Sequence, residues 1–108
     1  MSMDEKVKTV LAELRGELEK IYGERLKELI LFGSQARGEA DPESDLDVAV
    51  ILEGKLDACQ EINRTGELVT DLSLEHDLLV SLIFLEEQLY EENQWPITMN
   101  LHREGIAI

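Results

Sequence analysis

The sequence contains few cysteines, prolines, aromatic residues and basic residues. Among its 108 residues are one cysteine, two prolines and 5% aromatic residues. The single Cys59 excludes a disulfide within the chain and a thiolate metal cluster, and its spacing from Leu56 and Ile62 predicts a packing role on a helix. No apolar run approaches the length that spans a membrane, and the first residues lack the apolar core of a signal peptide. We therefore expect a cytoplasmic protein with no membrane contact.

Basic residues are scarce relative to acidic ones. Ten Lys and Arg against 24 Asp and Glu give a formal net charge of −14 at pH 7. Since this charge repels a phosphate backbone, we do not expect nucleic acid as a partner. A nucleotide that arrives with Mg²⁺ meets much less repulsion, and a basic protein surface would be attracted. The charge can equally serve only to keep the domain soluble.

The length and the apolar periodicity predict a single domain over residues 1–108, with one core and no separate substrate-binding domain. For Trp95 a place in the core is favoured over one in a contact surface, and residues 106–108 are expected to form an edge strand or an interface element. In chain order, the predicted elements are a helix over 4–22, a strand over 27–32, a strand ending at 52, a helix over 55–73, a strand over 76–85, a short acidic helix or loop over 86–93 and a helix beginning at 96. The positions expected to be buried on the two long helices are Val7, Val10, Leu11, Leu14, Leu18 and Ile21 on the first, and Leu56, Cys59, Ile62, Val69 and Leu72 on the second.

Two carboxylates, Asp45 and Asp47, begin the second predicted strand. Because alternate side chains of a strand point to the same face, both project together, while Leu46, Val48 and Val50 project from the other face. Two carboxylates held this close repel each other, and protonation, a basic partner or a divalent cation relieves that repulsion. Oxygen ligands favour Mg²⁺ or Mn²⁺, which is usually held by one or two carboxylates together with substrate phosphates.

A glycine-serine turn precedes this pair and ends the first predicted strand. Gly33 can adopt backbone angles that other residues avoid, and it lets a ligand approach the main chain. The Ser34 hydroxyl and nearby N–H groups can hold phosphate oxygens, and Arg37 can add a charge-assisted contact. A P-loop is excluded, because no Gly-x-x-x-x-Gly-Lys-Ser/Thr sequence occurs.

The combined pattern, Gly33-Ser34 followed after ten residues by Asp45-x-Asp47, resembles the signature of the polymerase-β-like nucleotidyltransferases, and especially their minimal nucleotidyltransferase (MNT) domains. The resemblance covers nearly the whole chain. It implies an α+β (α/β-like) fold with a small mixed sheet flanked by helices. It also implies a third carboxylate on a later strand, where Asp77 is the matching position; His76 would then point away as an edge residue.

The resemblance further implies an enzyme that uses two Mg²⁺ ions, or Mn²⁺, and ATP as substrate. Asp45, Asp47 and Asp77 would be the catalytic metal ligands, and Gly33, Ser34 and Arg37 would bind the nucleotide. MNT domains often act as antitoxins beside a HEPN-family toxin, which they neutralise by adding AMP to a tyrosine. A HEPN-type toxin is therefore the expected partner, in a hetero-oligomer or with a homodimer of this chain completing the cleft.

Two alternatives stay open at this point. A non-catalytic binding module could neutralise a partner by masking it, with a structural or vestigial metal site. A small-molecule nucleotidyltransferase of the aminoglycoside type would need a longer chain or a pocket built by a dimer. Acceptor identity, nucleotide preference and the number of AMP units added are not encoded in any motif of the chain.

Overall fold

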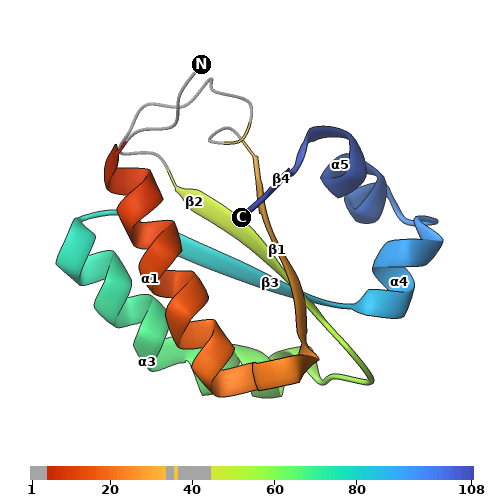
Figure 1. The fold of residues 1–108 in the computed structure, drawn as a ribbon, viewed down its shortest axis with the longest axis horizontal. Helices are drawn as coiled ribbons and strands as arrows, with labels where there is room; N and C mark the ends of the chain where they lie inside the picture. The colour runs from red at the N-terminus through yellow and green to blue at the C-terminus, as the bar shows by residue number, and fades with distance from the viewer. Residues whose placement is uncertain (1–4, 34–35, 37–44) are drawn as a thin grey trace.

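The computed structural model describes residues 5–33, 36 and 45–108. Within these residues the chain forms helices on both sides of one sheet (Figure 1). None of the described helices is long and apolar enough to cross a membrane. The elements in chain order are α1 (Glu5–Tyr22), the 3₁₀ helix η1 (Gly23–Arg25), β1 (Leu26–Phe32), β2 (Leu46–Leu52), α3 (Ala58–His76), β3 (Val80–Glu86), α4 (Glu87–Glu92), α5 (Pro96–Glu104) and β4 (Ile106–Ala107).

The sheet is mixed, as the resemblance implied, and its strand order is β3-β2-β1-β4. β1 pairs antiparallel with both β2 and β4, whereas β2 pairs parallel with β3. A parallel pair needs a crossover, and α3 supplies it between β2 and β3. The parallel pairing brings the first residues of β2 and β3 to the same end of the sheet.

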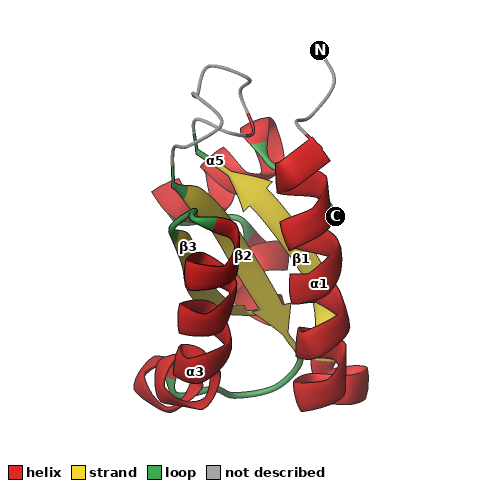
Figure 2. Ribbon diagram, turned by 90° about the vertical axis from the view of Figure 1, so that its left-hand side faces the viewer, coloured by secondary structure: helices red, strands yellow, loops and turns green. Residues whose placement is uncertain are grey.

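The sheet separates two apolar clusters, and Figure 2 shows α1 and α3 together in front of the strands. The larger cluster joins α1, α3 and one sheet face through buried residues such as Leu14, Leu18, Leu31, Val48, Val50 and Leu72. The smaller one lies on the other face, with Ile30, Ala49, Ile51 and Leu101 buried and with residues of α4 and α5 packed against them. The continuous apolar runs of β1 and β2 are therefore buried on both faces, as expected for central strands.

Both long helices form close to where periodicity predicts them. In α1 the expected apolar residues are buried except Ile21, which is 37% exposed, while the next residue, Tyr22, is buried instead. α3 begins and ends three residues later than predicted, because the Asp57 carboxylate caps it by accepting hydrogen bonds from the N–H groups of Cys59 and Gln60.

The buried face of the first half of α3 differs from the prediction. Cys59 is exposed and Ile62 is 55% exposed, so the predicted packing roles of both are wrong. Glu61 and Thr65 are buried in their place. The reason is a polar contact. The Tyr22 hydroxyl donates a hydrogen bond to the Glu61 carboxylate (2.7 Å), so the side of α3 that carries Glu61 packs against α1.

Trp95 also differs from the prediction, because its side chain is 58% exposed and lies outside the core. It precedes α5 in an extended conformation, where Pro96 starts the helix. The Thr98 hydroxyl accepts a hydrogen bond from the Trp95 N–H and donates one to the Trp95 carbonyl. Thr98, rather than Trp95, is the buried residue of this turn.

A buried polar cluster joins the end of α1 to the start of α3, at the end of the sheet where β2 finishes. Besides the bond from Tyr22, the Glu61 carboxylate has Arg64 at 3.5 Å, and the Arg64 guanidinium lies 6.0 Å from the centre of the Tyr22 ring. Burial, and then the hydrogen bond and charge of Glu61, raise the pKa of the Tyr22 hydroxyl well above its usual range. The hydroxyl therefore stays protonated as a donor to Glu61.

We predict that Tyr22→Phe destabilises the fold, because it leaves a carboxylate that is 2% exposed without its closest donor. The expected loss is about 1–3 kcal/mol, or roughly 4 °C or more in Tm. Thermal denaturation followed by circular dichroism measures it. Tyr90→Phe is the matched control, since the Tyr90 hydroxyl has no hydrogen bond to another described residue. Equal Tm values for the two variants would contradict the role assigned to this cluster.

Candidate active site

Gly33 lies against the Asp47 carboxylate where β1 ends. The register of the antiparallel pair sets Phe32 opposite Asp47, and the chain then turns at Gly33 with φ +77°. A Cβ atom on Gly33 would stand 2.7 Å from Asp47 Oδ2. Glycine is required here for two reasons, because side chains rarely adopt this φ and because the space for a Cβ is next to a carboxylate oxygen. The structure thus brings together two of the residues singled out from sequence.

Asp45 and Asp47 stand at the start of β2, with Asp45 exposed and Asp47 half-buried. Between and after them, Leu46 and Val48 are fully buried toward α1 and α3, which confirms the predicted alternation of faces. Burial, and secondly the charge of Asp45, raise the pKa of the Asp47 carboxyl above its ordinary value. A bound cation would offset both effects, because it replaces lost solvation and neutralises the second carboxylate.

Asp47 projects from the sheet face that α4 and α5 partly cover. Along β2 this face continues with Ala49 and Ile51, both fully buried in the smaller cluster. Asp47 is therefore the polar end of an otherwise apolar row. A carboxylate held on a rigid strand, half out of solvent, is a more precise ligand than one on a loop.

Ser34 and Arg37, which the sequence predicts to bind nucleotide, lie outside the described residues, and so does most of the segment that joins β1 to β2. Their contribution stays a prediction. Ala36 is described, is half-buried and packs against the larger cluster.

Asp77 is not part of the third strand, contrary to the prediction. It caps the end of α3 in the left-handed conformation (φ 51°, ψ 50°), and β3 begins only at Val80. The predicted strand over 76–85 began too early because α3 continues through His76. Asp77 remains at the same end of the sheet as Asp45, and its carbonyl accepts a hydrogen bond from Lys6 of α1 (3.4 Å). Its assignment as a third metal ligand stays a prediction.

The residues at the start of β2 fit Mg²⁺ or Mn²⁺. Two carboxylates supply oxygen donors only, and Asp47 Oδ2 lies where a Cβ of Gly33 would come within 2.7 Å of it, so the carboxylate packs directly against the glycine. Mg²⁺ usually keeps several waters and binds through one or two carboxylates plus substrate phosphates, so Asp47 on β2 and Asp45 immediately before that strand are enough carboxylates for such an ion. When bound, such an ion polarises phosphate oxygens and stabilises the charge that develops on them.

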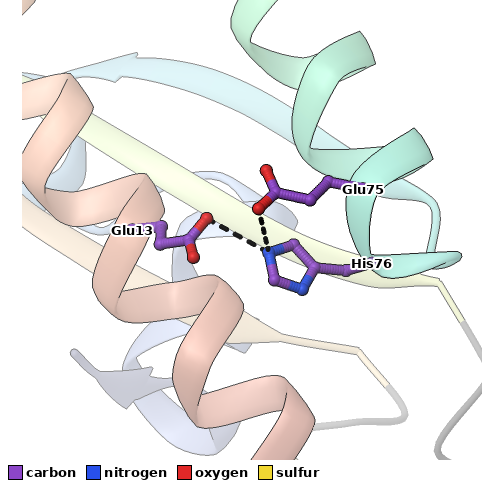
Figure 3. Close-up of side chains that lie close together, drawn as sticks. All are labelled: Glu13, Glu75 and His76. Atoms are coloured by element: carbon purple, nitrogen blue, oxygen red, sulfur yellow. Dashed lines mark hydrogen bonds and ion pairs between the residues drawn. The ribbon is translucent and has the colours of Figure 1, made fainter.

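A second group of candidate metal ligands lies between α1 and α3 (Figure 3). His76 Nε2 is 3.1 Å from Glu13 Oε2 and 3.9 Å from Glu75 Oε1. These residues belong to the helical layer, which covers the sheet face opposite Asp47, so the two groups do not combine into one site. An imidazole among the ligands suits Zn²⁺ or copper better than Mg²⁺. The side chains of Glu13 and Glu75 are 41% and 62% exposed, and a hydrogen bond between the His76 ring and the Glu13 carboxylate accounts for the contact.

A groove of about 750 Å³ also runs between α1 and α3 and is lined by residues such as Glu13, Glu67, Leu68 and Asp71. It lies in the helical layer, away from the carboxylate pair, so it is not the site where phosphate chemistry would occur.

A mixed sheet flanked by helices, with a glycine turn after one central strand and a carboxylate on the next, is the arrangement that the sequence resemblance implied. Residues 11–107 match the family described as "Nucleotidyltransferase domain". This chain therefore belongs to the nucleotidyltransferase domain family and is a nucleotidyltransferase.

Two relatives from Methanocaldococcus jannaschii are similar over most of their length. Both are named "Putative protein adenylyltransferase". MJ0604 is 32% identical over 88% of this chain and 90% of its own sequence. MJ0141 is 30% identical over 74% of this chain and 80% of its own sequence.

Solved structures share the fold at lower identity. A "putative nucleotidyltransferase" from Sulfolobus solfataricus superposes with a TM-score of 0.66 at 16% identity, over 99% of this chain and 89% of its own. A structure of a tri-AMPylated Shewanella oneidensis HEPN toxin in complex with an MNT antitoxin gives a TM-score of 0.55 at 19% identity, over 94% of this chain and 70% of the matched chain. These likenesses confirm the predicted α+β nucleotidyltransferase fold.

We predict that Gly33→Ala destabilises the protein by at least about 1 kcal/mol, because it forces a side chain into a positive φ and toward Asp47 Oδ2. Gly66→Ala is the matched control, since Gly66 lies within α3 with open space around it, and the change should be neutral or stabilising by up to about 1 kcal/mol. Urea denaturation measures both. A Gly33→Ala protein as stable as the wild type would mean that Asp47 does not lie where the structure has it.

Asp47 should make the stability of the fold depend on pH. Because its pKa is raised in the folded state, ionisation of the carboxyl lowers the free energy of unfolding. This loss is absent in acid and develops as the pH rises through the folded-state pKa. Asp47→Asn should therefore raise the Tm of the metal-free protein at pH 7 by about 1–4 °C. The gain should shrink as the pH falls below the ordinary pKa of an aspartate, because the wild-type carboxyl is then increasingly protonated as well. Asp71→Asn, an exposed change on α3, is the control, and a Tm that falls in Asp47→Asn at pH 7 would contradict the prediction.

Proposed function

We propose that this nucleotidyltransferase transfers AMP from ATP to a hydroxyl of a protein, a tyrosine of a HEPN-family toxin, and thereby neutralises that toxin. Asp45 and Asp47 hold Mg²⁺ at the start of β2. Gly33, Ser34 and Arg37 bind the triphosphate. Asp77 is the candidate third carboxylate, at the turn that precedes β3.

The observation that carries the proposal is the position of Gly33 against the Asp47 carboxylate, with Asp45 two residues away. It puts the glycine turn and two carboxylates at the same end of the sheet. Phosphate oxygens bound along the glycine turn would then meet a cation held by the carboxylates. Nucleotidyl transfer needs this combination, because charge builds on the phosphate and on the leaving group.

The transfer itself is a substitution at the α-phosphorus of ATP. The acceptor oxygen forms a bond to that phosphorus, the bond to the bridging oxygen of the β-phosphate breaks, and pyrophosphate leaves. The proton of the acceptor hydroxyl passes to a carboxylate of the site. The residues on β2 are held rigidly for this step, because β2 is paired on both sides by β1 and β3.

Three facts support a protein as the acceptor. The two Methanocaldococcus relatives are named as protein adenylyltransferases, the Shewanella complex pairs an MNT antitoxin with an AMPylated HEPN toxin, and the net charge of −14 favours a partner with a basic surface. The described residues form one small domain whose core is filled by α1, α3, α4 and α5. A partner that supplies its own tyrosine completes such a site.

We predict that Asp45→Asn and Asp47→Asn each lower AMP transfer at least about 100-fold, since the metal contributes several kcal/mol of charge stabilisation. The measurement is intact-mass spectrometry of a HEPN protein encoded beside this chain, after incubation with the chain, ATP and Mg²⁺. A gain of one or more AMP units identifies transfer, and peptide mapping identifies the modified side chain. Asp71→Asn, a change of the same kind in the groove between α1 and α3, away from the carboxylate pair, should leave transfer unchanged.

Other results would replace the proposal with a defined alternative. Neutralisation of the toxin by the Asp45 and Asp47 variants, without any mass gain, would establish a masking module. Absence of both complex and mass gain, together with labelling of a small hydroxylated acceptor, would establish a small-molecule nucleotidyltransferase. AMP found on a serine or threonine would support the proposed transfer to a protein but would show that tyrosine is not the acceptor.

A further inference from the structure

The strand register assigns a further residue to the carboxylate pair. Asp47 pairs in parallel with Ser81 of β3 and antiparallel with Phe32 of β1. Paired residues of neighbouring strands project from the same face, and adjacent strands are about 4.8 Å apart. The side chains of Phe32, Asp47 and Ser81 therefore form one row across the sheet, with the carboxylate in the middle.

The register at this point is fixed by hydrogen bonds outside the regular ladder. The Leu46 N–H donates to the Leu79 carbonyl (2.8 Å), just before the two strands pair. The Val80 N–H donates to the Ser73 hydroxyl (3.0 Å), which anchors the start of β3 to α3. A shift of one residue would turn Ser81 to the larger cluster and expose Val80, which is 2% exposed.

Packing does not account for a serine at this position. The next row on the same face is apolar, with Ile30, Ala49 and Ile83, and it belongs to the smaller cluster. Ser81 is exposed, and its hydroxyl has no hydrogen bond to another described residue. Asp47 and Ser81 are thus neighbouring polar residues on this face, at the end of the sheet where β2 begins.

We propose that Ser81 forms the β3 side of the metal site, where its neutral hydroxyl binds a cation held by Asp45 and Asp47, directly or through one of the cation's waters. This deepens the function proposed above, on which it rests, by adding a residue that the sequence motifs do not indicate. It makes the ligand set at the sheet edge two carboxylates and a hydroxyl. A cation without nucleotide is then bound weakly, because affinity rises with the number of charged ligands.

The test is Mn²⁺ binding by electron paramagnetic resonance in the absence of nucleotide and partner. Ser81→Asp should tighten Mn²⁺ binding about tenfold by adding a charged ligand beside Asp47, and Ser81→Ala should weaken it about threefold. Ser81→Thr keeps the hydroxyl and should restore near wild-type affinity. Thr70→Asp adds the same charge at an exposed position of α3 and should change little.

The double variant Asp47→Asn/Ser81→Asp should lose the gain, because the new carboxylate would then lack its partner. Equal affinities of Ser81→Asp and Thr70→Asp, in proteins with wild-type circular dichroism, would overturn the proposal. So would wild-type affinity in Ser81→Ala. Since neither ATP nor an acceptor is present, failure of AMP transfer in the earlier experiment would leave these binding results intact, and the two hypotheses can be separated.

Discussion

The pairing of β1 with β2 is the constraint on which the site depends. It sets the end of one strand opposite the start of the next, so that the turn at Gly33 and the carboxylate of Asp47 occupy the same few ångströms. Both strands are central and buried on both faces, which leaves the register no freedom to shift. The apolar core therefore holds the glycine turn against the half-buried Asp47 carboxylate, although the Asp45 carboxylate two residues away repels that group.

The two ends of the sheet differ in whether a buried or half-buried carboxylate has partners that stabilise its charge. At the end where β2 finishes, Glu61 is buried but satisfied by Tyr22 and Arg64. At the end where β2 begins, burial and the charge of Asp45 raise the pKa of the Asp47 carboxyl. The first arrangement stabilises the contact between α1 and α3. The second costs stability in the metal-free protein and is typical of a site that is completed by a ligand.

Much of the fold could be predicted from the sequence, because the signals for its helices and strands are local. The apolar runs predicted β1 and β2, the three-and-four spacing predicted α1, and the sequence pattern singled out Gly33 and Asp47, which the structure brings together. The errors arose where tertiary contacts override local pattern. Cys59 and Ile62 fit a helical stripe, yet the bond from Tyr22 to Glu61 turns the other side of α3 inward. Asp77 heads an apolar run, but α3 continues to the residue before it.

Ser81 could not have been found from sequence, since a lone serine in an apolar strand carries no signal. Its relation to Asp47 exists only in the parallel register of β2 and β3. That register also decides which of Asp77 and Ser81, four residues apart in the chain, lies beside the carboxylates. The sequence pattern alone does not distinguish between these two residues.

The crossover through α3 has a consequence for how the protein reaches its active form. The β1–β2 pair joins residues that are close in sequence, whereas β3 can pair with β2 only after the whole of α3 has closed back on the sheet. Loop-closure entropy makes such non-local pairing the slower event in folding. A newly made chain would therefore form the contact between Gly33 and Asp47 before β3 joins the sheet. β3 and β4 add to β2 and β1 only after the segments that separate them have folded back, so the two edge strands complete the sheet last.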